Sequence, residues 1–183
     1  MKYVKMLGLL AVAAAALMAF AGSASATILT SPEGSTYTGE IVATSTNSEL
    51  DGAFVTVKCG HSEAKGSVEN HGGERVSGPI TTLTFTTCNY HTTVENKGTL
   101  EVDTNGTVYS KEAKVTINTS VGSCTFTTAA SGTDVGTLSQ GKGASLNINS
   151  AKIPRTAGNF LCGSSGTWTG SYDLVTPNDL WVD

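Results

Sequence analysis

Basic residues are few in this sequence of 183 residues, and they form no cluster. Eleven Lys and Arg residues face 15 Asp and Glu residues, which gives a net charge of −4 at neutral pH. Removal of the first 26 residues takes Lys2 and Lys5 away, so nine of the 11 basic residues remain against 15 acidic ones and the net charge becomes −6. Nucleic-acid binding requires a basic surface that neutralises phosphates. The composition therefore excludes nucleic acid as a partner.

Long hydrophobic runs are missing after the N-terminus. The run Met6 to Phe20 follows two lysines and precedes the small residues Ala24-Ser25-Ala26, which is the pattern of a secretory signal peptide. A membrane-spanning helix needs about 20 predominantly apolar residues, and no later segment approaches that length. We therefore expect a signal peptide over residues 1–26 and a single domain over residues 27–183, secreted or held in the cell envelope, with no membrane span after cleavage.

Helical periodicity is also missing, and apolar residues alternate with polar ones instead. Val55, Val57 and Cys59 share one parity in "AFVTVKC", and "AKVTINT" and "SLNIN" repeat the pattern. A period of two over short runs predicts strands with one buried face. Gly, Pro and Asn break the runs at intervals typical of a sandwich or barrel. We predict an all-β fold, an antiparallel sandwich with barrel-like closure as the alternative.

The pair Asn105-Gly106 is the clearest turn in the sequence. Asn-Gly favours the two positive φ angles of a type I′ hairpin turn. Counting outward from a two-residue turn pairs Val102 with Tyr109. The apolar residues among alternate positions from Tyr109 to Ile117 would then share one buried face. We therefore expect a tight hairpin here with Tyr109 on its buried face.

The sequence contains no C-x-x-C motif, and its four cysteines all follow the expected signal peptide. An even number of cysteines in a secreted protein normally pairs. Three connectivities are open from sequence alone. We favour Cys59–Cys88 and Cys124–Cys162, because each pair closes a loop within one half of the chain. Pairing makes Cys88, in "TFTTCNYH", a structural residue and not a nucleophile.

Catalytic motifs are missing as well: the sequence has no G-x-S-x-G elbow, no P-loop and no dinucleotide fingerprint. Its acids are dispersed, so no pair of carboxylates is singled out. We expect no catalytic residue, no cofactor and no enzymatic activity. A weaker hypothesis rests on His61, His71 and His91, which lie close together in the sequence. These histidines would form a zinc or copper site or take part in a hydrolytic reaction.

Aromatic residues make up only 7% of the chain, so each is informative. Trp168 and Tyr172 share strand parity with Leu174 and are expected on a core face. Tyr37, Tyr90 and Trp181 are the candidates for an exposed ligand surface. The sequence thus favours a structural or binding protein of unknown ligand, with a carbohydrate-binding module as the alternative and a cell-wall glycan, extracellular glycan or protein as partner.

The order of motifs from Cys59 onward resembles that of a known group. It comprises the cysteine spacing, the segment "GTLSQGKGASLNIN", the W-x-G-x-Y motif that begins at Trp168, and the pair Thr176-Pro177. In these features the chain is similar to short secreted all-β proteins of unassigned function found in soil actinobacteria. The resemblance implies secretion and an all-β fold, and it carries over no catalytic residue.

The expected cleavage site and cysteine state are testable together by intact mass spectrometry. We expect the secreted protein to begin at Thr27 and to incorporate no alkylating reagent until it is reduced, because all four thiols are paired. Alkylation of Cys88 before reduction would contradict the pairing, and Cys88 with His91 would then become an active-site candidate.

Overall fold

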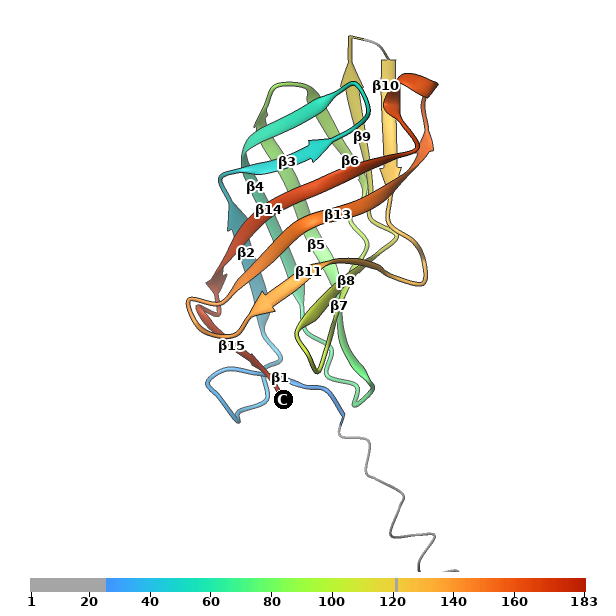
Figure 1. Cartoon of the computed structure of the whole chain (residues 1–183). Coiled ribbons are helices and arrows are strands. Elements are labelled where there is room, and N and C mark those ends of the chain that lie inside the picture. The colour runs from blue at the N-terminus through green and yellow to red at the C-terminus, as the bar shows by residue number, and fades with distance from the viewer. Residues whose placement is uncertain (1–25, 121) are drawn as a thin grey trace, which may run out of the picture.

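The computed structural model describes residues 26–120 and 122–183, in which the regular structure is β apart from one short 3₁₀ helix (Figure 1). The predicted all-β class is therefore confirmed. The strands are β1 (Leu29–Thr30), β2 (Glu40–Ser45), β3 (Ser48–Asp51), β4 (Thr56–Ser67), β5 (Arg75–Cys88), β6 (His91–Asn96), β7 (Thr99–Asp103), β8 (Thr107–Lys111), β9 (Lys114–Thr119), β10 (Gly122–Thr127), β11 (Thr133–Ser139), β12 (Gly141–Lys142), β13 (Ser145–Ala157), β14 (Ser165–Thr176) and β15 (Asp179–Val182). The helix η1 spans Phe160–Cys162. The expected signal peptide falls on residues 1–25, outside the described ranges, and on Ala26.

Eight strands form a closed antiparallel ring in the order β2, β4, β5, β7, β8, β11, β13, β14 and back to β2. The strand β3 extends the line of β2 and pairs with the same two neighbours, β4 and β14, further along. Closure gives every strand of the ring a hydrogen-bonded neighbour on both sides for part of its length. The barrel-like closure that the sequence analysis gave as an alternative to the sandwich is present in the ladders.

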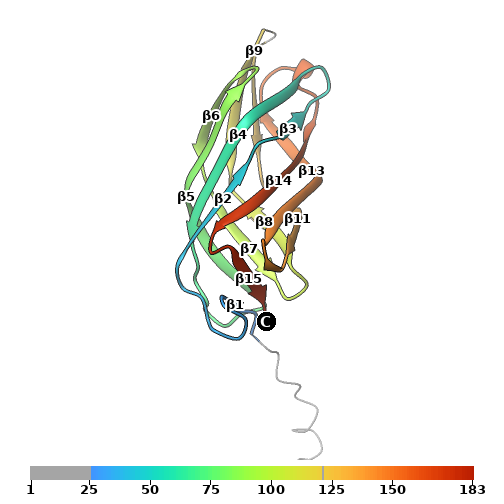
Figure 2. The same ribbon diagram turned by 90° about the vertical axis from the view of Figure 1, so that its left-hand side faces the viewer.

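The other strands lie at the two ends of the ring. The strands β10, β9 and β6 continue the sheet from β13, and the β9–β10 hairpin projects from one end (Figures 1 and 2). A small sheet of β1, β15 and β12 lies at the opposite end, where the C-terminus also lies. Leu29 and Leu180 from this small sheet are buried at 3% and 2% exposure. The small sheet therefore covers one end of the ring.

The ring strands bury alternate residues, as their sequence pattern predicts. On β4, Val57 and Cys59 are buried while Thr56 and Lys58 are exposed. The β9 residue Ile117 is also buried. Alternation places one set of side chains inside the ring and the other set outside. The interior is accordingly mostly apolar, and the outer surface carries the charges and many of the threonines.

The hairpin between β7 and β8 differs from its prediction by one residue. Three residues, Thr104 to Gly106, connect the strands, and Val102 pairs with Val108 instead of Tyr109. The carboxylate of Asp103 accepts hydrogen bonds from the backbone N–H groups of Asn105 and Thr107 at 2.9 and 3.0 Å. These bonds favour a three-residue turn in which only Gly106 has positive φ, at 79°. The shift moves Tyr109 to the outside of the ring.

Between β5 and β6 the wall has a stretch without a ladder. From Thr81 to Cys88, β5 pairs with β4 alone, and β6 pairs with β9 alone. The two strands are joined by the short connection after Cys88 at one end and by the hydrogen bond from Ile80 N to Gly98 O (3.0 Å) at the other. We call this stretch without a ladder between β5 and β6 the slit.

Gly98 closes the foot of the slit and has no room for a side chain. Its φ is +74°, and a Cβ atom there would lie 2.1 Å from the carbonyl oxygen of Lys111. Gly143 has a similar φ of +69°, but nothing lies within 4 Å of the position of its Cβ. The two glycines thus share the conformational requirement and differ in the available space.

We expect Gly98→Ala to destabilise the fold far more than Gly143→Ala. The conformational cost alone is about 1–2 kcal/mol at both sites, and overpacking adds about 1–3 kcal/mol at Gly98. Denaturant titration of the free energy of unfolding measures both variants. Equal losses would show that the close approach of Gly98 to Lys111 does not constrain the fold.

Candidate functional site

The ring encloses a cavity of about 200 Å³. All eight ring strands line it, and Leu29 and Leu180 border it at the end covered by the small sheet. Folded proteins pack their interiors closely and leave few voids larger than a water molecule. A cavity of this size is therefore a distinctive feature of the molecule and the leading candidate for a binding site.

Small inward residues leave this space unfilled. Ala43 on β2 and Ala64 on β4 are paired across the ladder and both line the cavity. Ser48, Ser110 and Ala113 line other parts of it. An eight-stranded barrel has an interior that larger side chains can fill or that can hold one small ligand. The small residues of this barrel leave part of its interior unfilled.

Aromatic side chains form one wall of the cavity. The indole of Trp168 on β14 packs edge-on against the side chain of Phe85, with centroids 6.5 Å apart. It also packs edge-on against Tyr172, with centroids 5.9 Å apart. All three line the cavity. Tyr172 and Leu174 are 2% and 8% exposed, so the expected core face on β14 is present. This wall offers an apolar ligand a broad contact surface.

The hydroxyls of Tyr172 and Ser48 interrupt the apolar lining beside this wall, and Ser62 contacts Tyr172. The Tyr172 hydroxyl and Ser62 Oγ share a hydrogen bond of 2.9 Å, in which either can donate. Ser48 also faces the Tyr172 hydroxyl, but not at hydrogen-bond geometry, and among the described residues Ser48 Oγ is the one buried side-chain N or O atom without a partner. Burial raises the pKa of Tyr172 to about 12, against smaller lowering effects of Ser62 and Ser48. We call Ser48, Ser62 and Tyr172 the hydroxyl cluster.

The slit borders the cavity. Leu83 and Phe85 line the cavity from β5, and Thr92 lines it from β6, so both sides of the slit contribute. Lys97 borders the cavity in the turn after β6 and is exposed. No backbone ladder joins β5 and β6 along this part of the cavity wall.

Charged groups stay at the border of the cavity. Three charged residues line it: Glu49, Lys65 and Lys97. Glu49 pairs with Lys58 at 3.0 Å, and Lys65 pairs with Glu63 at 3.2 Å. Lys97 has no ion pair in the described residues. The cavity therefore presents apolar groups and uncharged hydroxyls to anything inside it.

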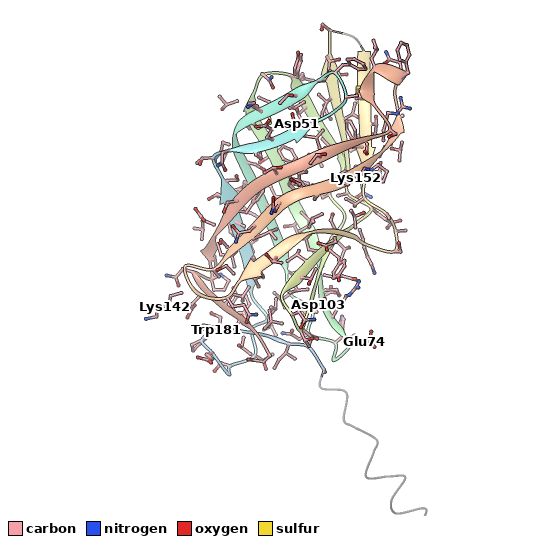
Figure 3. All side chains as sticks on the ribbon, in the orientation of Figure 1. Asp51, Glu74, Asp103, Lys142, Lys152 and Trp181 are labelled. Atoms are coloured by element: carbon pink, nitrogen blue, oxygen red, sulfur yellow. A yellow bond between two sulfur atoms is a disulfide. The ribbon has the colours of Figure 1, made fainter. Side chains whose placement is uncertain are left out.

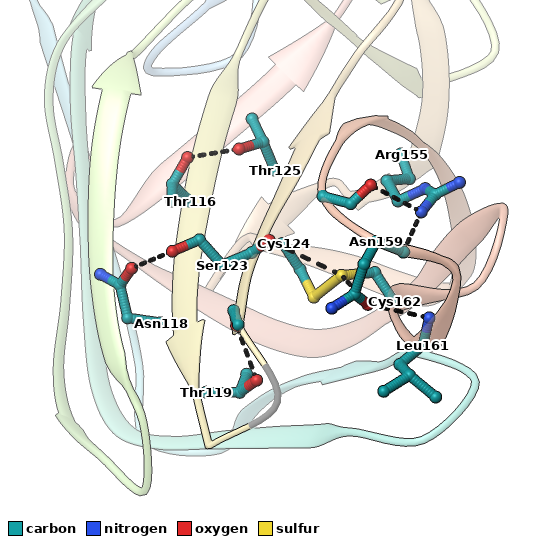
Figure 4. Close-up of a disulfide and its surroundings, with 12 residues drawn as sticks. Thr116, Asn118, Thr119, Ser123, Cys124, Thr125, Arg155, Asn159, Leu161 and Cys162 are labelled. Atoms are coloured by element: carbon teal, nitrogen blue, oxygen red, sulfur yellow. Dashed lines mark hydrogen bonds between the residues drawn. A yellow bond between two sulfur atoms is a disulfide. The ribbon is translucent and has the colours of Figure 1, made fainter.

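The four cysteines pair as Cys59–Cys88 and Cys124–Cys162, which confirms the favoured connectivity. The first bond joins directly opposed residues of β4 and β5 beside the slit. The second ties η1 to β10, where Asn159 Oδ1 accepts a hydrogen bond from Leu161 N at 2.9 Å (Figure 4). A paired Cys88 has no thiolate and is no nucleophile. Each bond is expected to stabilise the fold by about 3–4 kcal/mol in the chain-entropy model.

The structure does not bring the three histidines together. His61 on β4 and His91 on β6 are exposed near the Cys59–Cys88 bond. His71 lies in the connection between β4 and β5, where its Nε2 is 3.3 Å from Glu69 Oε2. Within residues 26–120 and 122–183, no group of three or more His, Cys, Asp or Glu is placed to hold a metal ion. The geometry gives the metal hypothesis no support.

The three candidate surface aromatics do not share one surface either. Trp181 pairs with Thr30 in the small sheet, and Tyr37 N donates to Leu29 O nearby at 2.8 Å (Figure 3). Tyr90 follows Cys88 at the far end of β5 and packs against the core. All three are half-buried. A glycan platform on Trp181 and Tyr37 stays a prediction, without Tyr90 as its neighbour.

Neither the hydroxyl cluster nor the cavity was identified from sequence. Small residues at inward positions are the signal, but they are recognisable only when the pairing of Ala43 with Ala64 and the closure of the ring are known. Ser48 and Ser62 resemble the many other serines of the chain until their burial, at 3% and 0% exposure, is seen.

No protein-family model matches the chain, and no curated protein or solved structure matches it. The resemblance to secreted actinobacterial proteins therefore stays a prediction. The two disulfides are consistent with an extracellular or otherwise oxidising environment. In the described residues, no helix has the length and apolarity needed to cross a membrane.

The outer face of the ring carries a charge cluster around Glu101. This residue faces away from the cavity and receives Lys111 Nζ at 2.5 Å and Arg75 Nη1 at 3.1 Å. The Arg75 guanidinium also lies 3.7 Å from the ring centroid of Tyr109. Burial favours a higher pKa of Glu101, but the hydrogen bonds from Lys111 and Arg75 outweigh it and hold the pKa below its usual value. The cluster joins β5, β7 and β8.

We expect Glu101→Gln to lower the free energy of unfolding by about 1 kcal/mol at pH 7. A carboxyl whose folded-state pKa is depressed stabilises the fold above its unfolded-state pKa and loses that contribution as pH falls through the folded-state value. The difference between wild type and variant is thus present at pH 7 and disappears in acid. Denaturant titrations at pH 7 and pH 3 measure it, with Glu69→Gln as a control at an exposed pair. A difference independent of pH would contradict the assignment.

Proposed function

We propose that the protein is a secreted or cell-envelope binding protein that takes a small apolar molecule into its barrel. One observation carries the proposal: a cavity of about 200 Å³ with an apolar lining, bordered on one side by the slit. Small-molecule sites are concave, mostly apolar and contain a few polar groups. The cavity has this composition, with the hydroxyl cluster as its polar part.

The size of the cavity supports binding over a purely structural role. An unfilled void costs about 24 cal/mol per Å³, so 200 Å³ corresponds to about 5 kcal/mol of lost stability. The total stability of a domain is only about 5–15 kcal/mol. A ligand that fills the space recovers part of this energy on binding. An apolar cavity of about 150 Å³ in another protein binds benzene, so a substituted benzene is a reasonable first probe.

The lining favours an apolar ligand over a sugar. A carbohydrate presents many hydroxyl groups, each of which needs a partner when it is buried. The cavity wall is mostly apolar. Its hydroxyls belong to Ser48 and Tyr172, to Ser110 and Thr128, which bond each other at 3.3 Å, and to Ser67, Ser77 and Thr92. The carbohydrate-binding alternative thus depends on the outer surface around Trp181 and not on the cavity.

Titration of p-xylene into the protein by isothermal calorimetry tests the proposal. We expect saturable binding with one site and a rise in the thermal midpoint, because the ligand binds only the folded state. Ala64→Phe places a ring at a cavity-lining position and is expected to weaken binding at least tenfold. Absence of binding heat in the wild type, or unchanged affinity in Ala64→Phe, would refute the proposal.

Two controls separate the cavity from the surface. Thr84→Phe makes a similar change at an exposed, outward position of β5 and is expected to leave p-xylene affinity unchanged. Phe54→Ser and Phe160→Ser remove the most exposed aromatic side chains, at 71% and 79% exposure, and are also expected to have no effect. Loss of binding in these variants would place the ligand on the surface.

A further inference from the structure

We propose that the cavity selects apolar molecules that carry one uncharged hydrogen-bonding group, such as an alcohol or phenol. Ser48 and Tyr172 bind this group, and Ser62 holds the Tyr172 hydroxyl by a hydrogen bond. The inference rests on the proposed binding of apolar molecules and names the class of ligand within it. It is carried by two buried hydroxyls of the lining beside the aromatic wall, those of Ser48 and Tyr172, of which the Ser48 hydroxyl has no partner among the described residues.

Ser48 is the central observation. Its side chain is 3% exposed and lines the cavity, and its Oγ makes no hydrogen bond among the described residues. Buried polar groups in folded proteins are nearly always paired, because an unpaired one loses its hydrogen bonds to water without replacement. Ser110 is also a buried serine in the lining, but its hydroxyl is paired with Thr128. A ligand hydroxyl beside Ser48 would supply the missing partner.

The Tyr172 hydroxyl can exchange hydrogen bonds with the same ligand group. Tyr172 and Ser62 are buried at 2% and 0% exposure, and either hydroxyl can donate in their 2.9 Å bond. A hydroxyl has one donor and two acceptor positions, so the bond between them leaves capacity on the Tyr172 oxygen. A ligand hydroxyl, which both donates and accepts, matches this arrangement. A pure hydrocarbon leaves Ser48 unpaired.

The cluster favours an uncharged group over a carboxylate. Tyr172 remains a neutral hydroxyl over the whole physiological range, because burial raises its pKa to about 12. The two lysines that border the cavity are Lys65, which is paired with Glu63, and Lys97, which lies in the turn at the foot of the slit. A carboxylate at the hydroxyl cluster would be buried without a cation, which is strongly unfavourable. An anionic ligand would instead need to bind at Lys97.

Three probes with the same ring separate these cases: p-xylene, p-cresol and p-toluate carry a methyl group, a hydroxyl and a carboxylate at one position. At pH 7.5 we expect p-cresol to bind wild type about two- to tenfold more tightly than p-xylene, the range expected for one net hydrogen bond. We expect p-toluate to bind at least tenfold more weakly than p-xylene. Calorimetric titration of each probe gives these ratios.

Substitution of the cluster tests which residues make the distinction. Ser48→Ala and Tyr172→Phe are expected to reduce the affinity ratio of p-cresol to p-xylene toward one, with p-xylene affinity unchanged. Ser48→Ala is also expected to raise the thermal midpoint of the ligand-free protein, because it removes an unpaired buried hydroxyl. If Ser48 had only a structural role, Ser48→Ala would not both raise the thermal midpoint and lower the affinity ratio of p-cresol to p-xylene. Ser110→Ala is the matched control and should keep the wild-type ratio.

The outcomes distinguish this inference from the function on which it rests. If p-xylene binds but the ratio is the same in wild type and both cluster variants, the assignment of the hydroxyl cluster is wrong while the cavity still binds apolar molecules. If p-toluate binds as tightly as p-cresol and loses affinity in Lys97→Gln, the ligand is anionic and the inference is overturned. If no probe binds, the proposed function fails and the inference with it.

Discussion

Closure of the eight-strand ring by backbone hydrogen bonds is the constraint on which the other features depend. The closing contacts are made by β2 and β3, which together span the distance between β4 and β14. Because the ladder returns to its start, inward side chains from all eight strands face a common interior. The same closure sends Glu101, Tyr109 and Thr84 outward. Without it, the inward alanines and serines would face no shared space.

Alternation made the strands predictable, because it depends only on neighbours in the sequence. The buried parity of Val57 and Cys59 and the core face of Tyr172 and Leu174 were accessible in this way. The cysteine pairing was predicted from the loop that each pair closes within one half of the chain. The Asn105-Gly106 hairpin shows the limit of such reasoning. Its position was correct, but the register was wrong by one residue because the Asp103 side chain takes two backbone N–H groups of the turn. A side-chain contact of this kind leaves no periodic pattern.

The candidate site could not be predicted, because it is made by residues that are unremarkable one at a time. Ala43 and Ala64 leave space in the interior because they face each other across the ladder. Ser48 is a candidate for ligand binding because it is buried beside Tyr172 and has no hydrogen-bond partner among the described residues. These relations join positions more than 20 residues apart in one case and more than 100 in the other. The surface candidates suggested by sequence, Tyr37, Tyr90 and Trp181, were chosen for aromatic chemistry alone, and the fold separates Tyr90 from the others.

The cavity also determines how the molecule responds to compression. Unfolding under hydrostatic pressure is driven by a decrease in volume that scales with the internal void eliminated. An empty barrel with a void of about 200 Å³ is therefore softer and more sensitive to pressure than a solid core of the same size. Occupation of the void would remove that volume difference. The mechanical stiffness of the barrel is in this way a property of the protein and its occupant together, and not of the chain alone.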